Sequence, residues 1–179
     1  MILFSHPADF TPVCTSEFIA FQKSLPEFEA LNCELMGLSV DSVYSHIAWL
    51  ESIEKNFGIK VTFPVIEDVS MAVSTAYGMI HESSSSTETV RSVFVIDPNG
   101  TLRALTHYPL TVGRSISELL RLIKALQLSE QQDVAIPAEW QPGDDVLQNA
   151  PCAPDGSSRD ENYKAWYYRI VANDTGKAG

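Results

Sequence analysis

Positive charge is scarce in this chain of 179 residues, which has 12 Lys and Arg against 23 Asp and Glu and a net charge of -11. Nucleic acids and anionic membranes are bound by clustered Lys and Arg, so this balance argues against both as partners. The sequence also lacks an apolar run long enough to cross a membrane and a basic segment ahead of an apolar one at its N-terminus. We therefore expect no nucleic-acid partner, no membrane partner and no signal peptide.

Cysteine is scarce too. The three cysteines are odd in number and have no regular spacing, which argues against the disulfide framework of a secreted protein. A reducing compartment suits such a chain, and we predict a cytoplasmic location. The length suits one domain with a small appendage. The composition changes after residue 127, so we predict a main domain over residues 1–130 and a C-terminal subdomain or dimerisation arm over residues 131–179.

Residues 4–18 have the features of a reactive thiol at a helix N-terminus. They contain the end of an apolar strand, a proline-rich loop and a first helical turn. Thr11 is a good N-cap, and Pro12 suits the first helical position because its missing N–H costs nothing there. Cys14 is then the third helical residue, where unpaired backbone N–H groups and the positive end of the helix dipole favour the thiolate. A thiolate in this place is a candidate nucleophile.

Hydrophobic periodicity and turn residues predict an α/β chain in which strands and helices alternate. The helix that begins at Pro12 is expected to stop at Pro26, with a second short helical piece after it. The clearest hairpin has its turn at residues 97–100, Asp-Pro-Asn-Gly. The expected strands are residues 2–4, 33–40, 63–66, 90–96, 101–108 and 165–171, and the other expected helices are residues 43–57, 70–77 and 115–128.

The run Ser-His-Pro-Ala-Asp-Phe-Thr-Pro-Val-Cys-Thr-Ser-Glu at residues 5–17 resembles the active-site loop of the peroxiredoxins, in the form found in the 1-Cys peroxiredoxin-6 subfamily. The resemblance extends to about residue 144, and because the matching strand begins almost at Met1, we expect the chain to be shortened at its N-terminus relative to the family. It implies a thioredoxin-like, three-layer α/β/α fold with a small C-terminal extension, and the predicted order of elements agrees with that fold. It also implies a thiol peroxidase that reduces hydrogen peroxide and alkyl hydroperoxides.

The resemblance assigns catalytic roles to four residues. Cys14 is the peroxidatic nucleophile, whose thiolate attacks the terminal peroxide oxygen and becomes a sulfenic acid. No metal and no organic cofactor is needed, because the sulfur carries both electrons. The Thr11 hydroxyl would accept from the sulfur side or donate to the peroxide, and Pro7 would shield the thiolate from water. Arg91, at the start of a strand, would stabilise the thiolate and orient the peroxide oxygens.

Three further residues are expected to support this site. Arg114 resembles a second arginine of the family's pocket and would pair with Glu17, which follows Cys14 on the helix. His6 stands where the subfamily also has a histidine, and it would hydrogen-bond near the sulfenic acid or help to admit a reductant. A buried core histidine is an equal alternative for His6. A zinc site that combines His6, Cys14 and another histidine is disfavoured, because the sequence has no ligand spacing for it.

The remaining cysteines leave alternatives open. Cys33 lies in an apolar strand and is expected to be a core residue. Cys152 lies where some peroxiredoxins have a resolving cysteine, so one alternative is a 2-Cys peroxiredoxin that closes a disulfide with Cys14. Another alternative is a non-catalytic redox sensor or assembly subunit. In the leading interpretation an external thiol, glutathione or thioredoxin-like, reduces the sulfenic acid, and the chain forms a homodimer or a higher homo-oligomer.

Overall fold

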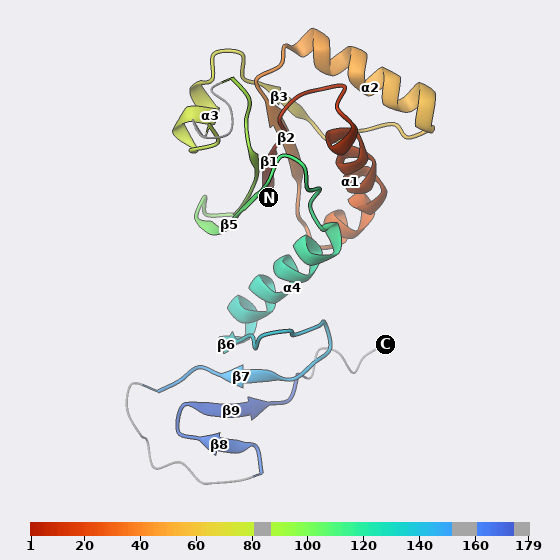
Figure 1. Cartoon of the computed structure of the whole chain (residues 1–179). Helices are drawn as coiled ribbons and strands as arrows, with labels where there is room; N and C mark the ends of the chain where they lie inside the picture. Colours follow the sequence, from red (N-terminus) through yellow and green to blue (C-terminus); the bar gives the residue numbers. More distant parts are fainter. Residues whose placement is uncertain (81–86, 152–160, 174–179) are drawn as a thin grey trace. The chain divides into compact units, whose positions relative to one another are not determined.

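A five-stranded sheet in the order β3-β2-β1-β4-β5 is the framework of residues 1–116 in the computed structural model (Figure 1). The central strand β1 runs parallel to β2 and antiparallel to β4. At the edges, β3 pairs parallel with β2, and β5 pairs antiparallel with β4. The strands are β1 (Ile2–Ser5), β2 (Leu35–Ser39), β3 (Val65–Glu67), β4 (Arg91–Ile96) and β5 (Leu102–Tyr108).

Helices cover both faces of this sheet. Successive side chains of β1 point to opposite faces, so each face presents apolar groups that a helix buries. On one face the ring of Phe4 stacks on Phe21 of α1, with their centroids 4.3 Å apart, and meets Phe18 edge-on at 5.6 Å. On the other face Leu3 packs in a cluster that includes Val73 of α3. The arrangement confirms the predicted α/β/α layers. The helices of this unit are α1 (Pro12–Ala30), α2 (Val43–Phe57) and α3 (Ala72–Ala76).

The expected break of the first helix at Pro26 is wrong, since α1 continues through this residue. A proline inside a helix removes one backbone hydrogen bond and crowds the preceding turn. Phe21 and Phe28, on either side of Pro26, are both fully buried. Their burial stabilises the continuous helix and offsets the cost of the proline.

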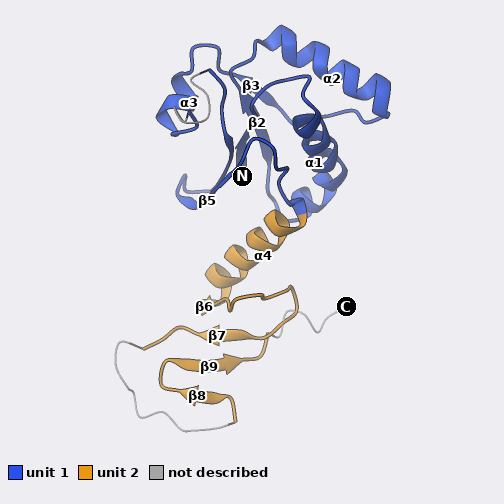
Figure 2. Cartoon of the chain, viewed as in Figure 1, with its two compact units in different colours: residues 1–116 blue, residues 117–179 orange. Residues whose placement is uncertain are grey.

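The second compact unit begins at Ser117 (Figure 2). Its core contains Leu128, Trp140 and Val146. The single strand predicted over residues 165–171 is wrong, because these residues form a hairpin whose turn lies at Trp166 and Tyr167. The elements of this part are α4 (Ile116–Gln132) and a sheet in the order β6-β7-β9-β8, made of β6 (Val134–Ala135), β7 (Val146–Gln148), β8 (Tyr163–Ala165) and β9 (Tyr168–Val171).

The structure describes residues 1–80, 87–151 and 161–173. Within these ranges, none of the helices has the length and apolar character needed to span a bilayer. The candidate resolving residue Cys152 and most of the expected loop at residues 81–89 lie outside the described residues.

Candidate active site

Cys14 lies in the first turn of α1, in the register that the sequence predicts. Thr11 has the extended backbone of an N-cap residue, and Pro12 is the first helical residue. Cys14 is therefore the third helical residue, and its side chain is fully buried. The first backbone N–H groups of a helix have no partner inside the helix, so this end presents donors and partial positive charge. The backbone thus supplies one of the two features that favour a thiolate here.

Arg91 supplies the second feature. It is the first residue of β4, and its Nη1 donates to Cys14 Sγ at 3.3 Å and to Glu17 Oε2 at 2.7 Å. Its Nε donates to the carbonyl oxygen of Leu110 at 2.9 Å, which fixes the plane of the guanidinium. Only 2% of Arg91 is exposed, so its charge acts on the sulfur with little screening by water.

Glu17 and Arg114 hold this arrangement together, as the sequence predicts. Arg114 donates from Nε to Glu17 Oε1 and from Nη2 to Oε2, both at 2.8 Å. Its Nη1 also donates to the carbonyl oxygens of Ser5 at 2.8 Å and Ser92 at 3.0 Å. Burial lowers the pKa of Arg114, and the Glu17 carboxylate opposes this shift. One carboxylate therefore bridges two buried guanidinium groups, and it joins α1 to β1 and β4.

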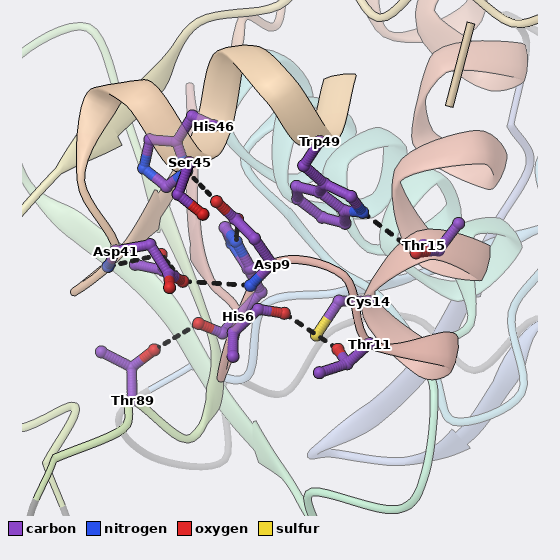
Figure 3. Close-up of polar contacts among 12 residues, drawn as sticks. His6, Asp9, Thr11, Cys14, Thr15, Asp41, Ser45, His46, Trp49 and Thr89 are labelled. Carbon is purple, nitrogen blue, oxygen red and sulfur yellow. Dashed lines mark hydrogen bonds and ion pairs between the residues drawn. The ribbon is translucent and has the colours of Figure 1, made fainter. Parts of the chain in front are cut away.

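Thr11 and Pro7 lie in the loop between β1 and α1. The Thr11 hydroxyl does not cap the helix (Figure 3). It donates instead to the carbonyl oxygen of Ala8 at 2.9 Å, which ties the loop to itself. Its lone pairs are left to accept another hydrogen bond. Pro7 is buried, as a shielding role requires. Between them, Phe10 adopts a left-handed backbone with φ of 55° and has 60% of its surface exposed.

An apolar groove opens beside this loop, between α1 and α2. Its lining includes Phe10 and Thr11 from the loop, Ile19 from α1, and Trp49 and Phe57 from α2. An alkyl group placed in the groove would lie next to Thr11 and would be removed from water, which is favourable for apolar surface.

His6 belongs to a second buried polar cluster, which sequence reasoning missed apart from His6 itself. The carboxylate of Asp9 lies between two imidazoles, with Oδ1 at 2.9 Å from His6 Nε2 and Oδ2 at 2.8 Å from His46 Nδ1 (Figure 3). Burial alone would raise the pKa of Asp9, but the hydrogen bonds from His46, His6 and Ser45 together hold it well below its usual range. The backbone N–H of Asp9 donates to Asp41 Oδ2 at 3.0 Å.

Among the described residues, His6, Asp9 and His46 are also the one group whose potential metal-ligating atoms converge, all within 4.8 Å of one another. Each imidazole already bonds to a separate oxygen of Asp9, so we interpret the group as a hydrogen-bonded cluster. The sequence carries one signal for it. His46 falls on the buried side of α2 with Trp49 and Ile53, and a polar residue on an apolar helix face needs a partner.

Cys33 lies just before β2 and is buried, as predicted for a core residue, with 5% of its surface exposed. Burial raises the pKa of its thiol. Its Sγ donates to the carbonyl oxygen of Glu34 at 3.8 Å. Cys33 is thus held as a neutral thiol, because burial outweighs the opposing effect of the nearby terminal ammonium group.

Comparisons with known proteins identify the family to which the chain is similar. Residues 1–105 match the AhpC/TSA family, and residues 125–157 match the C-terminal domain of 1-Cys peroxiredoxin. Peroxiredoxin 2 of Thermoplasma acidophilum is 48% identical over 96% of this chain and 86% of its own length. A peroxiredoxin of Thermotoga maritima is 52% identical over 91% of this chain and 75% of its own length.

Two solved structures are also similar. Yeast mitochondrial 1-Cys peroxiredoxin, studied for thiol resolution via glutathione/thioredoxin systems, has a TM-score of 0.85 and 42% identity, and the match covers 96% of this chain and 85% of that one. Peroxiredoxin 6 of Arenicola marina has a TM-score of 0.81 and 32% identity, with 97% and 86% covered. These likenesses confirm the thioredoxin-like fold that the sequence predicts.

Proposed function

Because this chain belongs to the AhpC/TSA family of peroxiredoxins and is a thiol-dependent peroxidase, we propose that Cys14 is the residue that attacks the peroxide. The observation that carries the proposal is the guanidinium nitrogen of Arg91 at 3.3 Å from a fully buried sulfur at a helix N-terminus. Charge and backbone donors both favour the thiolate at this position. Enzymatic activity also sets aside the alternative of a non-catalytic sensor or assembly subunit.

The reaction follows from this geometry. The Cys14 thiolate attacks the terminal oxygen of the hydroperoxide, an S–O bond forms, and the O–O bond breaks. The sulfur keeps the transferred hydroxyl as a sulfenic acid, and the other oxygen leaves and takes up a proton to become water or an alcohol. Arg91 has donors in a planar fork that can hold the peroxide oxygens while charge moves between them. Glu17 and Arg114 keep that fork in place.

The surroundings of Cys14 support both proposed substrates, hydrogen peroxide and alkyl hydroperoxides. The buried sulfur and the buried Pro7 keep bulk water away from the thiolate. The apolar groove beside Thr11 can take the alkyl part of an organic hydroperoxide. Thr11 has a lone pair free for a hydroxyl of the bound peroxide, and His6 is proposed to hydrogen-bond near the sulfenic acid.

A pair of matched variants tests the assignment. Cys14→Ser should abolish peroxide turnover, whereas Cys33→Ser, which changes a buried thiol elsewhere in the same unit, should leave turnover intact. Stopped-flow measurement of peroxide consumption with excess dithiothreitol separates the two. Normal turnover in Cys14→Ser would refute the role of this residue.

We propose that an external thiol, glutathione or thioredoxin-like, returns the sulfenic acid to the thiolate. The yeast 1-Cys relative is described with the same two systems. Such reductants belong to a reducing compartment, so the cytoplasm is the proposed location. The alternative is a disulfide between Cys14 and Cys152. Non-reducing gels of peroxide-treated protein test it, because Cys152→Ser would remove the disulfide and stop recycling only in a 2-Cys protein.

We also propose that the chain forms a homodimer or a higher homo-oligomer, with residues 1–130 as the peroxidase domain and residues 131–179 as a subdomain or dimerisation arm. The sheet edge supports association. Among the described strands, β5 pairs only with β4, and its side chains Leu102 and Leu105 are exposed. An edge strand of this kind can pair with another chain. The native mass in solution, compared with that of Leu105→Lys, checks this proposal.

A further inference from the structure

The histidine cluster beside α1 has an unequal distribution of protons, which its contacts determine. Both ring nitrogens of His46 face oxygen acceptors, Asp9 Oδ2 at 2.8 Å and the carbonyl oxygen of Ile66 at 3.3 Å. A carbonyl oxygen can only accept a hydrogen bond, and so can an ionised carboxylate. His46 therefore carries a proton on each nitrogen and is a cation. In agreement, burial alone would lower the pKa of His46, but Asp9 raises it overall.

His6 is in the opposite state. Its ring is fully buried, and its Nε2 lies 2.9 Å from Asp9 Oδ1, so the proton is on Nε2. Burial lowers the pKa of His6, and the positive charges of His46 and Arg114 add to this effect against the attraction of Asp9. The single carboxylate of Asp9 cannot compensate two buried imidazolium ions, and its negative charge is already balanced by the His46 cation. His6 is therefore a neutral imidazole.

The consequence is a free acceptor inside the protein. His6 Nδ1 is buried and has no hydrogen-bond partner among the described residues. Buried polar atoms without a partner are costly and rare in native proteins, so such an atom calls for a ligand that arrives later. The only groups that can bond to an unprotonated ring nitrogen are donors, such as a hydroxyl.

The ring that carries this acceptor packs on the side of α1 that bears the proposed nucleophile. The His6 ring meets Phe18 edge-on with centroids 4.8 Å apart, and Phe18 lies one helical turn after Cys14 on the same face. The backbone is held as well, since Thr89 donates to the carbonyl oxygen of His6 at 2.6 Å. The ring is thus fixed in place before any substrate binds.

From these contacts we propose that Asp9 and His46 are positioning residues of the peroxidase site. They keep His6 as a neutral imidazole with its proton on Nε2, so that Nδ1 accepts a hydrogen bond from a hydroxyl at the Cys14 site. The proposal rests on the function proposed for Cys14. Each member has a separate role, since Asp9 selects the tautomer, His46 neutralises Asp9, and His6 receives the hydroxyl.

Nuclear magnetic resonance of the full-length chain with nitrogen-15 in its histidines tests the resting state without any turnover. The wild-type protein should show His6 with an unprotonated Nδ1 and a protonated Nε2 between about pH 6 and pH 8. A His6 signal with a proton on Nδ1 in this range would overturn the proposal. Because this measurement needs no catalysis, its failure is distinct from a failure of the Cys14 assignment.

Two variants should move His6 in opposite directions, which simple loosening of the fold would not do. His46→Gln keeps a donor for Asp9 but removes the cation, so the pH at which His6 becomes protonated should rise, by about one unit. Asp9→Asn removes the anion, so His6 should stay neutral to a still lower pH. Loosening would instead move both variants toward free histidine, and that result would refute the proposal. Three further charged groups bear on this cluster, namely Arg114 and the thiolate proposed at Cys14 for His6, and Asp41 for His46, and all three stay unchanged in both variants.

Kinetics complete the test. In His46→Gln the rate of Cys14 oxidation should match the wild type near pH 8 and be about tenfold lower one pH unit below the new titration point of His6. Asp68→Asn is the matched control, because Asp68 is a buried, hydrogen-bonded carboxylate that serves Ser74 instead of a histidine. It should leave the His6 signals and the pH profile unchanged. If the fall in the rate of Cys14 oxidation toward low pH occurs at the same pH in His46→Gln as in the wild type, the proposed role of His46 is excluded.

Discussion

Cys14 and Cys33 are buried thiols of the same unit, and their surroundings differ in whether burial or positive charge dominates. Cys14 has a guanidinium nitrogen at 3.3 Å and lies in the first turn of a helix. Cys33 precedes a strand, its thiol donates weakly to a carbonyl oxygen, and burial raises its pKa. Burial removes water from both sulfurs, so the difference lies in what replaces the water. At Cys33 the cost of burial outweighs the attraction of the nearby terminal ammonium group and keeps the thiol protonated, whereas the helix N-terminus and the buried Arg91 favour a thiolate at Cys14.

The largest expected effect follows from removing the anion that both arginines share. Glu17→Gln would leave two buried guanidinium groups without a carboxylate, and we expect the free energy of unfolding to fall by about 3–5 kcal/mol. Urea unfolding measures this loss. Glu118→Gln is the control, because Glu118 is exposed and accepts hydrogen bonds from Arg121 on the surface of α4, so this variant should lose less than about 1 kcal/mol of unfolding free energy. Equal losses of unfolding free energy in Glu17→Gln and Glu118→Gln would show that the buried ion pairs of Glu17 stabilise the fold no more than the exposed pair of Glu118.

The next largest effect is expected from removing the Arg91 guanidinium, which lies beside Cys14 and not beside Cys33. Arg91→Met should slow the oxidation of Cys14 by peroxide about 10²-fold or more, because the aligned charge is lost. Alkylation of Cys33 in the same variant should keep its wild-type rate. Arg103→Met removes an arginine of the same sheet that pairs with Asp97 at 3.5 Å, and it serves as the control in stopped-flow experiments. A wild-type rate in Arg91→Met would contradict the comparison.

A smaller effect concerns pH at Cys33. Because burial raises its pKa in the folded state, Cys33 should stay protonated at pH values near 8.5, where a free cysteine begins to ionise. The unfolded chain then loses this proton first, so the contribution of Cys33 to stability is complete below that pH and declines as pH rises above it. Unfolding measured at low and high pH in Cys33→Ala should lack this decline. An identical decline in both proteins would assign it to another group.

The smallest effect is expected at Thr11. Thr11→Val removes the hydrogen bond to the carbonyl oxygen of Ala8, which should cost about 1 kcal/mol of stability. Thr11→Ser keeps the hydroxyl and should restore both stability and turnover. If Thr11→Val is as active as Thr11→Ser, the hydroxyl has no part in binding the peroxide.

The loop and first turn of α1 could be predicted from the sequence because their signals are local. Thr11 as N-cap residue and Pro12 as first helical residue favour the same helix start without help from the rest of the chain, and the position of Cys14 follows from them. Arg91 and Arg114 are different. Arg91 is 77 positions from Cys14 in sequence and Arg114 is 97 positions from Glu17, and no local rule predicts contacts over such separations. They were predicted through the resemblance to a family, which supplies tertiary contacts that a single sequence does not.

The errors have physical reasons of the same kind. Asp9 and His46 were missed because their contact joins a loop to α2 across 37 positions. Pro26 does not end the helix because the local cost of proline, which is visible in sequence, is outweighed by the burial of Phe28 beyond it, which is a tertiary effect. The strand predicted at residues 165–171 is a hairpin, and its Trp-Tyr turn lacks the glycine or asparagine that usually marks one.

The register of β1 has a consequence for the fidelity of folding. Phe4 is opposite Gly37 of β2, and a Cβ atom at that glycine would meet the Phe18 ring at 3.2 Å. A slip of one residue along the strand would turn Phe4 to the opposite face of the sheet, where Leu3 packs, and carry His6 and the loop behind it to the wrong side. A molecule with this register shift would contain every residue of the site but would not bring them together, so it would have no peroxidase activity. The specific activity of a refolded sample therefore reports the fraction of chains with the correct strand register.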